Sequence, residues 1–489
     1  MMRLHLNPSC VAHAALFISF LFTGTVLSQS LRGTLQYRTD LMITTSFCCQ
    51  HVKMGGPDAY VVSAPSRNEV TVMDWNGTDW QLRSTFAGTQ TGEEFGRGLA
   101  MSGHNDLAIG SPGYDTATQN NVGRVQVYHY DGTNWTQRGT DIMPPVGGLR
   151  SGFSLAMPSP NTIAIGTPND VLGLNNGAGD TGMAIVYDWN GTDWIQRGLP
   201  MMGRAVFDRA GYDIDMPDVN TLALGGFVQE DQFPAGPVGK DAPGEVSVFN
   251  WNGTAWVRLG SPITGEANGD AFGITVSMPD TDTIAVGAPF ADNGFGFGST
   301  SGDTMVYDYD GNNWLQRGAT VEGTQDNSLF GFSVSMVDDN NFAMLSEFLL
   351  SLYQYDPISS TWVENPVQIQ GAIQNPQDVD WLAPTALGYG SFNGGYIAVF
   401  DTSMVLGVAD LANDLAIQAY PNPSAGLVTL KHPAAGMVQV SDLSGKLVSV
   451  QELDAREETT LQLPDAPGVY LLRVILDTGT EQTLRVIRE

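Results

Sequence analysis

Trp189-Asn190-Gly191-Thr192-Asp193-Trp194 is one copy of a hexapeptide that recurs along this chain and decides its fold. Each copy places an aromatic residue, an Asn-Gly or Asp-Gly pair and a closing tryptophan in nearly the same frame. The other copies are residues 75–80, 130–135, 251–256 and 309–314, with a degenerate one at 355–362. The closing tryptophans lie 48 to 62 residues apart. A regular period of this length indicates one supersecondary unit repeated along the chain.

Each copy is typical of the turn of a β-hairpin. Asn-Gly and Asp-Gly between apolar runs favour a type I′ turn, whose two central residues need positive φ. An alternating strand precedes the turn, as in residues 125–128, and a Trp-x-Gln-Arg strand follows it, as in residues 135–138. Two more strands complete the repeat: Phe-Gly-x-x-Val-x-Met, as in residues 272–278, and Ala-Ile-Gly-x-Pro, as in residues 164–168. Four short antiparallel strands per repeat predict one blade of a β-propeller.

Seven blades are predicted when the third strand of each repeat is counted. These strands begin at Glu69, Arg124, Met183, Glu245, Asp303, Leu349 and Gly395. The seventh blade has a third strand at residues 396–400, but no Trp-x-Gln-Arg strand follows it. Residues 35–38 resemble the missing piece. Because a ring must close to remove its open edges, we expect an N-terminal strand to finish the last blade.

The repeat resembles the FG-GAP repeats of integrin-α-like seven-bladed propellers, since Phe-Gly is followed by Gly-Ala-Pro within a unit of this length. The resemblance covers residues 31–404. Many FG-GAP blades carry a calcium loop of alternating aspartates between these two strands. Here the connections at residues 102–106, 158–161 and 279–282 supply one or two carboxylates each, whereas Ca²⁺ takes six to eight oxygen ligands. We therefore expect no cofactor, calcium being the one that the resemblance leaves open.

The first 28 residues have the pattern of a secretory signal peptide. Arg3 lies in a short basic region, residues 14–22 are mostly apolar, and Val26 and Ser28 suit the −3 and −1 positions of cleavage before Gln29. The apolar stretch is too short for a permanent membrane span, and no other segment approaches eighteen apolar residues. We expect a secreted, extracellular protein without a transmembrane segment.

After Phe400 the repeat stops, and a second domain is expected beyond a linker at residues 405–415. Residues 416–489 contain short alternating strands separated by turn residues. This pattern favours a small Ig-like β-sandwich. The predicted fold class is therefore all-β, with a seven-bladed propeller at residues 29–404 followed by a sandwich.

The C-terminal domain closely resembles the type A sorting domain of the type IX secretion system of Bacteroidota. The matching residues are Tyr420, Pro421, Asn422, Pro423, Asp442, Gly445, Lys446, Gly468 and Tyr470, together with a final strand at 483–487. The resemblance implies two partners: an outer-membrane translocon that recognises the domain and a sortase-type peptidase that removes it. The cargo is then released or anchored to the outer-membrane surface. The alternative is a purely structural Ig-like module.

Charge excludes two classes of partner. The chain has 52 acidic and 22 basic residues, a formal charge of −30. Nucleic-acid binding needs clustered Lys and Arg, and an anionic membrane surface repels such a chain. The acidic residues are spread through the predicted loops, which favours a solvated surface over an acidic ligand site.

No catalytic or metal constellation is visible in the sequence. Cys48 and Cys49 are adjacent, so they could bridge only as a strained ring, and we interpret them as two buried small residues. His51, His104 and His129 fall in different strands and loops without metal-like spacing. No Gly-x-Ser-x-Gly motif joins a strand to a helix. We therefore assign no catalytic, cofactor-binding or metal residue.

A non-catalytic binding or adhesion role is the function that the sequence favours, with an extracellular protein or glycan as ligand. The longest loops, at residues 113–123, 169–182, 228–244 and 291–302, all join second and third strands and should project from one end of the ring. The alternative is a polysaccharide-active hydrolase or lyase on the same scaffold. Two carboxylates with raised pKa in the central funnel would favour the enzyme, and an empty or apolar funnel would favour binding.

Overall fold

The chain divides into two units, Met1–Leu406 and Gly407–Glu489. In the first, the computed structural model describes residues 31–34, 51–77, 80–144, 150–168, 181–204, 209–226, 243–291, 300–325, 328–346, 350–364, 376–383, 386–391 and 397–400. In the second, it describes residues 418–420, 426–431, 435–442, 446–454, 458–464, 466, 468–477 and 481–488. These residues are almost entirely β-strands and turns, with one 3-10 turn at Pro65–Arg67. No helix within them is long and apolar enough to cross a bilayer.

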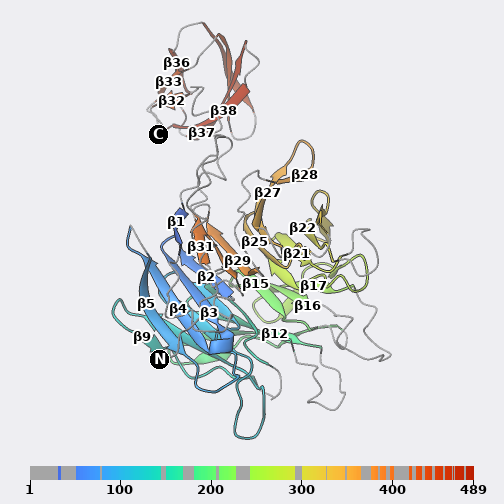
Figure 1. The fold of residues 1–489 in the computed structure, drawn as a ribbon. Coiled ribbons are helices and arrows are strands. Elements are labelled where there is room, and N and C mark those ends of the chain that lie inside the picture. The colour runs from blue at the N-terminus through green and yellow to red at the C-terminus, as the bar shows by residue number, and fades with distance from the viewer. Residues whose placement is uncertain are drawn as a thin grey trace, which may run out of the picture. The chain divides into compact units, whose positions relative to one another are not determined.

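Seven antiparallel sheets form the described part of the first unit (Figure 1). From the innermost strand outward, the first four are β2 (His51–Gly56), β3 (Ala59–Ala64), β4 (Glu69–Trp75) and β5 (Trp80–Ala87); β6 (Leu99–Ser102), β7 (Asp106–Ser111), β8 (Arg124–Tyr130) and β9 (Trp135–Gln137); β10 (Ser154–Ser159), β11 (Thr162–Thr167), β12 (Met183–Trp189) and β13 (Trp194–Gln196); β15 (Asp213–Asp218), β16 (Thr221–Gly226), β17 (Glu245–Trp251) and β18 (Trp256–Arg258). The other three are β20 (Thr275–Ser277), β21 (Thr283–Ala288), β22 (Asp303–Tyr309) and β23 (Trp314–Gln316); β25 (Ser333–Asp338), β26 (Asn341–Leu345), β27 (Leu350–Asp356) and β28 (Thr361–Glu364); β29 (Pro376–Ala383), β30 (Ala386–Ser391), β31 (Ile397–Phe400) and β1 (Leu31–Thr34). Short strands β14 (Met201–Met202), β19 (Ile263–Thr264) and β24 (Val321–Glu322) pair with β12, β17 and β22.

The sheets are arranged in a closed ring. Their innermost strands contact one another in the order β2, β6, β10, β15, β20, β25 and β29, and β29 contacts β2 again. An N-terminal strand completes the last sheet, as expected: β1 pairs with β31, with Leu31 opposite Phe400. Residues 35–38, which we expected to form this strand, lie outside the described residues. The pairing strand is the segment just before them.

Pairs of glycines allow neighbouring sheets to approach closely. A Cβ at Gly110 in the second strand of one sheet would lie 2.0 Å from the carbonyl oxygen of Gly152 in the next. The same clash would arise between Gly287 and Gly331. Gly152 and Gly331 also have φ of +86° and +80°, a conformation that L side chains rarely adopt. Both glycines of the repeat, one in Phe-Gly and one in Ala-Ile-Gly, are therefore required by the sheet-to-sheet contact.

The hairpin turn differs from the predicted type I′ turn. Trp189 pairs with Trp194, so the loop between them holds four residues. Gly191 has φ +100°, whereas Asn190 does not have positive φ. Instead, the Asn190 side-chain oxygen accepts hydrogen bonds from the backbone N–H groups of Thr192 (2.8 Å) and Asp193 (2.9 Å). The predicted type I′ turn was wrong, because the Asn190 side chain accepts the hydrogen bonds of the backbone N–H groups in the loop.

The Trp-x-Gln-Arg strand is a clasp between neighbouring sheets. The indole N–H of Trp194 donates to the carbonyl of Arg138 in the previous sheet, at 2.8 Å. The Arg138 guanidinium lies 4.6 Å from the ring centre of Trp189 and donates to the Pro160 carbonyl. Arginine over tryptophan is a favourable cation–π contact. We call this combination the arginine clasp; Arg83, Arg197 and Arg317 occupy the same place in their sheets.

The second unit contains two antiparallel sheets. One has the strand order β32 (Gln418–Tyr420), β33 (Leu427–Lys431) and β36 (Glu458–Gln462), and the other β35 (Leu447–Leu453), β34 (Gly436–Asp442), β37 (Gly468–Leu476) and β38 (Glu481–Arg488). Alternating apolar residues of both sheets form one core. Its members include Val428 and Leu430 from the first sheet and Val438, Val440 and Leu472 from the second. The two sheets therefore pack face to face.

Candidate functional site

A cavity of about 570 Å³ lies at the centre of the ring and is lined by all seven innermost strands. In a strand, alternate side chains point to the same face. The second and third variable positions of the Phe-Gly-x-x-Val-x-Met strand therefore face the cavity. In ring order these are His51 and Lys53, Gly98 and Ala100, Ser154 and Ala156, Asp213 and Asp215, Thr275 and Ser277, Ser333 and Ser335, and Asp378 and Asp380.

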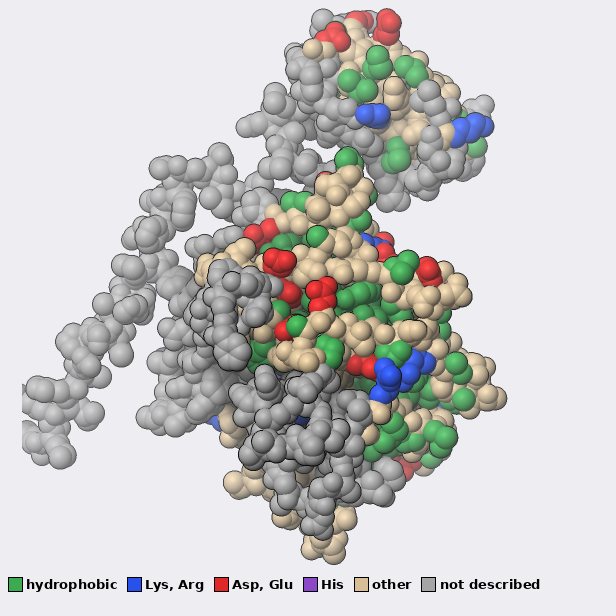
Figure 2. All heavy atoms as spheres, turned by 90° about the vertical axis from the view of Figure 1, so that its right-hand side faces the viewer, with side chains coloured by type: hydrophobic (Ala, Val, Ile, Leu, Met, Phe, Trp, Pro, Cys, Tyr) green, Lys and Arg blue, Asp and Glu red, His purple; other side chains and the backbone are tan. Residues whose placement is uncertain are grey.

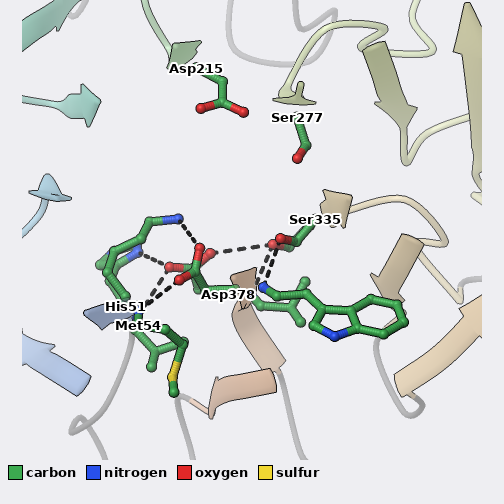
Figure 3. Close-up of polar contacts among 12 residues, drawn as sticks. His51, Met54, Asp215, Ser277, Ser335 and Asp378 are labelled. Atoms are coloured by element: carbon green, nitrogen blue, oxygen red, sulfur yellow. Dashed lines mark hydrogen bonds and ion pairs between the residues drawn. The ribbon is translucent and has the colours of Figure 1, made fainter. Parts of the chain in front are cut away.

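The walls of this cavity differ in chemistry. Strand β15 supplies an acidic wall, and β20 and β25 supply hydroxyl groups. Strands β29 and β2 supply a mixed wall of two carboxylates, a lysine and a histidine, while β6 and β10 contribute mostly small side chains. Figure 3 shows Asp215 set apart from Asp378 and His51 in the cavity. The cavity is thus polar, and its charges are unevenly distributed.

Side chains that face the cavity also tie each inner strand to the next. The Asp213 and Asp215 carboxylates accept hydrogen bonds from the backbone N–H groups of Val276 (2.9 Å) and Met278 (2.7 Å) on β20. Inner strands are edge strands of their sheets, so their outward N–H groups would otherwise lack partners.

The same pattern continues around part of the ring. The remaining pairs of acceptor and N–H donor are Thr275 and Val334, Ser277 and Met336, Ser333 and Val379, Ser335 and Trp381, Asp378 and Val52, and Asp380 and Met54. Aspartate, serine and threonine therefore share one structural task at these positions: each bridges an inner strand to its neighbour.

A cationic group closes the mixed wall. Lys53 Nζ lies 3.4 Å from Asp380 Oδ1, and His51 Nδ1 lies 3.8 Å from Asp378 Oδ2 (Figure 3). Arg97 Nη1 lies 3.0 Å from His51 Nε2. Burial lowers the pKa of His51 well below its ordinary value, and Arg97 and Lys53 lower it further. His51 is therefore neutral and can accept a hydrogen bond from Arg97.

Lys53 keeps its charge despite its enclosure. Burial by itself lowers the pKa of the Lys53 ammonium, but Asp378 and Asp380 outweigh that effect, with smaller contributions from Asp213 and Asp215. The net result is a raised pKa. Lys53 is consequently an internal counter-ion for the carboxylates of the cavity.

The acidic wall has raised pKa values. Burial raises the pKa of Asp213 to about 7 and that of Asp215 to about 6, although the N–H groups of Val276 and Met278 and the charge of Lys53 oppose the shift. Burial also raises the pKa of Asp378. The sequence did not single out any of these aspartates. The available signal was that the second and third variable positions of the repeated strand change between charged, hydroxylated and small residues, whereas the position between them is Leu, Ile or Val in five of the strands, at residues 99, 155, 214, 276 and 334.

The predicted sorting residues that are described lie in both sheets of the second unit. Tyr420 ends β32, Asp442 ends β34, and Gly468 begins β37. Asp442 pairs in register with Tyr470, whose hydroxyl donates to the Ala466 carbonyl at 2.9 Å. Lys446 is exposed. Residues Pro421, Asn422, Pro423 and Gly445 lie outside the described residues, as do the predicted cleavage residues Ser28 and Gln29 and the pair Cys48 and Cys49.

The three histidines singled out by the sequence are not brought together. His51 lies in the cavity, whereas His129 Nδ1 is 2.9 Å from Asp106 Oδ1 on the outer part of another sheet. Within the described ranges, no group of three or more His, Cys, Asp or Glu side chains is arranged to hold a metal ion. Of the long loops, residues 113–123 are described and join β7 to β8, while most of the other three lies outside the described ranges. On the face shown in Figure 2, acidic side chains are spread among uncharged ones.

Comparison with known proteins identifies the C-terminal unit and supports the fold of the first. Residues 418–488 match the family model of the secretion system C-terminal sorting domain. No curated protein matches the chain. A solved structure of hydrazine synthase from Kuenenia stuttgartiensis is similar at 12% identity, covering 75% of this chain and 99% of that one, with a TM-score of 0.50. The WD40 β-propeller domain of Doa1 is similar at 11% identity over 76% and 97% of the two chains, with a TM-score of 0.47. At such identities the likeness concerns the fold alone.

Proposed function

We propose that this chain is a seven-bladed β-propeller that binds a ligand outside the cell, carried there by an Ig-like sorting domain. The match of residues 418–488 to a secretion system sorting domain supports export by the type IX secretion system. The resemblance adds the outer-membrane translocon and a sortase-type peptidase as partners. The exported propeller is then secreted or anchored at the outer-membrane surface.

The binding role rests on one observation: the polar side chains of the central cavity are fixed by backbone hydrogen bonds within a closed ring. Asp213, Asp215, Ser277 and Ser335 each hold the N–H group of a neighbouring strand. Side chains whose orientation is locked in this way form a preorganised surface, which lowers the entropy cost of ligand binding. The cavity volume, about 570 Å³, is in the range of small-molecule sites.

The polysaccharide-active enzyme remains the second candidate, because the carboxylates with raised pKa that would favour it are present in the cavity. Asp213 has a pKa of about 7 and Asp215 of about 6. Asp378, whose pKa burial also raises, lies on β29 and accepts the Val52 N–H. Two features favour binding instead. Asp213 and Asp215 project from the same strand, whereas the acid and base of a glycosidase flank the bond that they cleave. Each also accepts two backbone hydrogen bonds, Asp213 from Ile214 and Val276, and Asp215 from Met216 and Met278.

Delivery is tested in a host that has the type IX apparatus. The full chain should reach the cell surface or the medium, and a chain truncated before Tyr420 should remain in the periplasm. A truncated chain that still reaches the surface would contradict the sorting role.

Binding and catalysis are separated with the purified full chain. We expect saturable capture on arrays of extracellular glycans and proteins, and no new reducing ends when the same glycans are incubated with it. Release of reducing ends that is lost in Asp215→Asn but kept in the turn variant Asp310→Asn would favour the enzyme.

A further inference from the structure

We propose that the central cavity binds a hydroxylated primary amine of about monosaccharide size, with its ammonium group against Asp213 and Asp215. The inference rests on the proposed binding function and names the ligand class. Three observations carry it: the charge balance of the cavity, the hydroxyl donors that face it, and the spacing of its carboxylates.

The charge balance favours a cation on the side of β15. The cavity contains four aspartates and two permanent cations, Lys53 and Arg97. Lys53 pairs with Asp380, and Arg97 contacts His51 and lies 4.0 Å from the ring centre of Phe153. Within the described part of the ring, no basic nitrogen lies within 4 Å of the Asp213 or Asp215 carboxylate. A cation bound between them would supply the missing counter-charge.

Hydroxyl groups on the neighbouring strands favour a ligand that carries oxygen atoms. Thr275, Ser277 and Ser335 are more than nine-tenths buried, with 6%, 8% and 8% of their surface exposed. Each hydroxyl oxygen accepts a backbone N–H bond, so its hydrogen is left to donate. None of these hydrogens has an acceptor among the described residues, and the three side chains line the cavity. Ligand hydroxyl oxygens are suitable acceptors, and an aliphatic amine without them would leave these donors unmet.

The spacing of the carboxylates favours an organic cation over a metal ion. A hard divalent cation needs several oxygens that converge at about 2.0–2.6 Å. The carboxylates are instead held apart by their separate bonds to Val276, Met278, Val52 and Met54. No metal-holding group of three acidic, His or Cys side chains occurs in the described ranges. A molecule that spans from an acidic wall to a hydroxyl wall fits this arrangement.

The test uses calorimetric titration of the full chain with three matched probes. Glucamine carries an ammonium group and hydroxyls, sorbitol carries the hydroxyls alone, and hexylamine carries the ammonium alone. At pH 8 we expect glucamine to bind at least tenfold more tightly than either of the other two. This preference should shrink as the pH falls to 5, because Asp213 and Asp215 become protonated. Equal binding of glucamine and sorbitol, or no binding of glucamine, would overturn the proposal.

Two variants should change the affinity for glucamine in opposite directions. The double variant Asp213→Asn, Asp215→Asn should weaken glucamine at least tenfold and leave sorbitol unchanged. Lys53→Gln should tighten glucamine several-fold, because it removes a positive charge that pairs with Asp380 and acts on Asp213 and Asp215 from a distance; a misfolded protein could not show this gain. The control Asp310→Asn, in a hairpin turn, should change neither.

A failure of the cavity assignment can be distinguished from a failure of the proposed binding function. If array ligands bind the double variant as well as the native chain, the binding role stands and the cavity assignment is wrong. Glucamine affinity that is abolished by Ca²⁺ would instead indicate a metal site and would also overturn the proposal.

Discussion

One junction between neighbouring sheets is built differently from the others that show the clasp. Where the β10–β13 sheet meets the β15–β18 sheet, Arg197 donates to the Val219 carbonyl, pairs with Asp188 and lies over Trp256. Where the β15–β18 sheet meets the β20–β23 sheet, Leu259 occupies the arginine's place. There the Trp314 indole still donates to the Leu259 carbonyl, at 3.0 Å.

At the Leu259 junction there is no guanidinium, and the acidic residues there show which role the arginine has at the other junctions. Asp282 occupies the loop position of Asn220, and a hydrogen bond with Asp280 raises its pKa, with burial and the charge of Asp280 adding to the shift. At the same junction, on the inner side of the ring, Asp213 and Asp215 hold β20. The comparison teaches that indole-to-carbonyl bonding and apolar packing suffice to keep two sheets together, while arginine adds charge neutralisation. The predictions that follow test this difference.

The largest effect is expected from removing the tryptophan at the two kinds of junction. Trp194→Ala deletes a buried indole, its bond to the Arg138 carbonyl and its contact with the Arg138 guanidinium. We expect a loss of about 3–5 kcal/mol in the free energy of unfolding. Trp314→Ala, at the junction without arginine, should cost about 1 kcal/mol less, since no cation–π contact is lost. Equal losses in denaturant titrations would remove the distinction between the junctions.

A second test converts the arginine junction into the leucine one. Arg197→Leu removes the guanidinium that donates to the Val219 carbonyl and to the Asp188 carboxylate, and among the described residues Asp188 keeps only the Thr162 hydroxyl as a donor. The expected cost is about 2 kcal/mol, the size typical of an unmet hydrogen-bonding group together with a lost charged bond. Chemical denaturation measures it. Gln196→Leu, one residue earlier and exposed, is the control and should stay within about 0.5 kcal/mol.

A third prediction concerns the inner side of the leucine junction. The folded-state pKa of Asp213, about 7, lies above its unfolded value of 3.8. The folded state therefore binds the proton more tightly, and the contribution of Asp213 to stability is lost as the pH rises from about 4 to about 7. Relative to the native chain, the free energy of unfolding of Asp213→Asn should rise by up to about 4 kcal/mol as the pH rises from 4 to 8, since each pKa unit corresponds to about 1.4 kcal/mol.

Denaturation at the two pH values measures this difference. For the control Asp131→Asn, the hydrogen bonds from Asn134 and Thr133 lower the pKa of Asp131, so its effect should be confined to pH below about 4. A pH-independent difference for Asp213→Asn would contradict the raised pKa.

A smaller gain is expected when the clasp is restored. Leu259→Arg places a guanidinium near Asp282 and should stabilise the chain by about 0.5–1 kcal/mol at low salt. The gain should fade at high ionic strength because the charges are screened. A loss of stability at low salt would show that packing of Leu259, which contacts the core of the β15–β23 region, outweighs the new charge pair.

The smallest effect is expected in the turns, which are alike at both junctions. Asp310 accepts N–H bonds from Asn312 and Asn313, as Asn190 does from Thr192 and Asp193. Asp310→Asn should therefore change the free energy of unfolding by less than about 0.5 kcal/mol at pH 7. A larger change would mean that the turn charge interacts with the clasp.

The repeat could be predicted because it is written in local patterns, and an N-terminal closing strand because a ring must close, although β1 is the segment before residues 35–38, where we expected it. Residues 125–128 alternate, and each hairpin copy fixes one turn. The family of the second unit was likewise predicted from Tyr420, Asp442 and Tyr470, and the match of residues 418–488 confirms it. The predicted conformation of the turn was wrong, because the preference of Asn-Gly for type I′ turns does not tell which atom accepts the hydrogen bonds of the loop.

A central funnel was expected from the propeller, but the residues that face one another in it could not be predicted because ring closure brings them together. Lys53 and Asp380 are far apart in the sequence and meet only because β29 lies beside β2. Asp213 lies at a variable position of the strand, and the chemistry of a variable position depends on what faces it across the ring. The sequence did name the criterion, raised carboxylate pKa values, but it could not select Asp213 and Asp215.

The strand β1 has a consequence for the order in which this molecule can be completed. Leu31 is among the first residues of the ring to be synthesised, and Phe400, its partner, is the last. Pairing over such a separation carries a large loop-closure entropy and a slow rate. During synthesis, β1 stays unpaired until β31, its partner strand, has been made. The nascent chain must therefore be kept from pairing β1 with another copy, and a chain interrupted before residue 397 would expose that strand permanently.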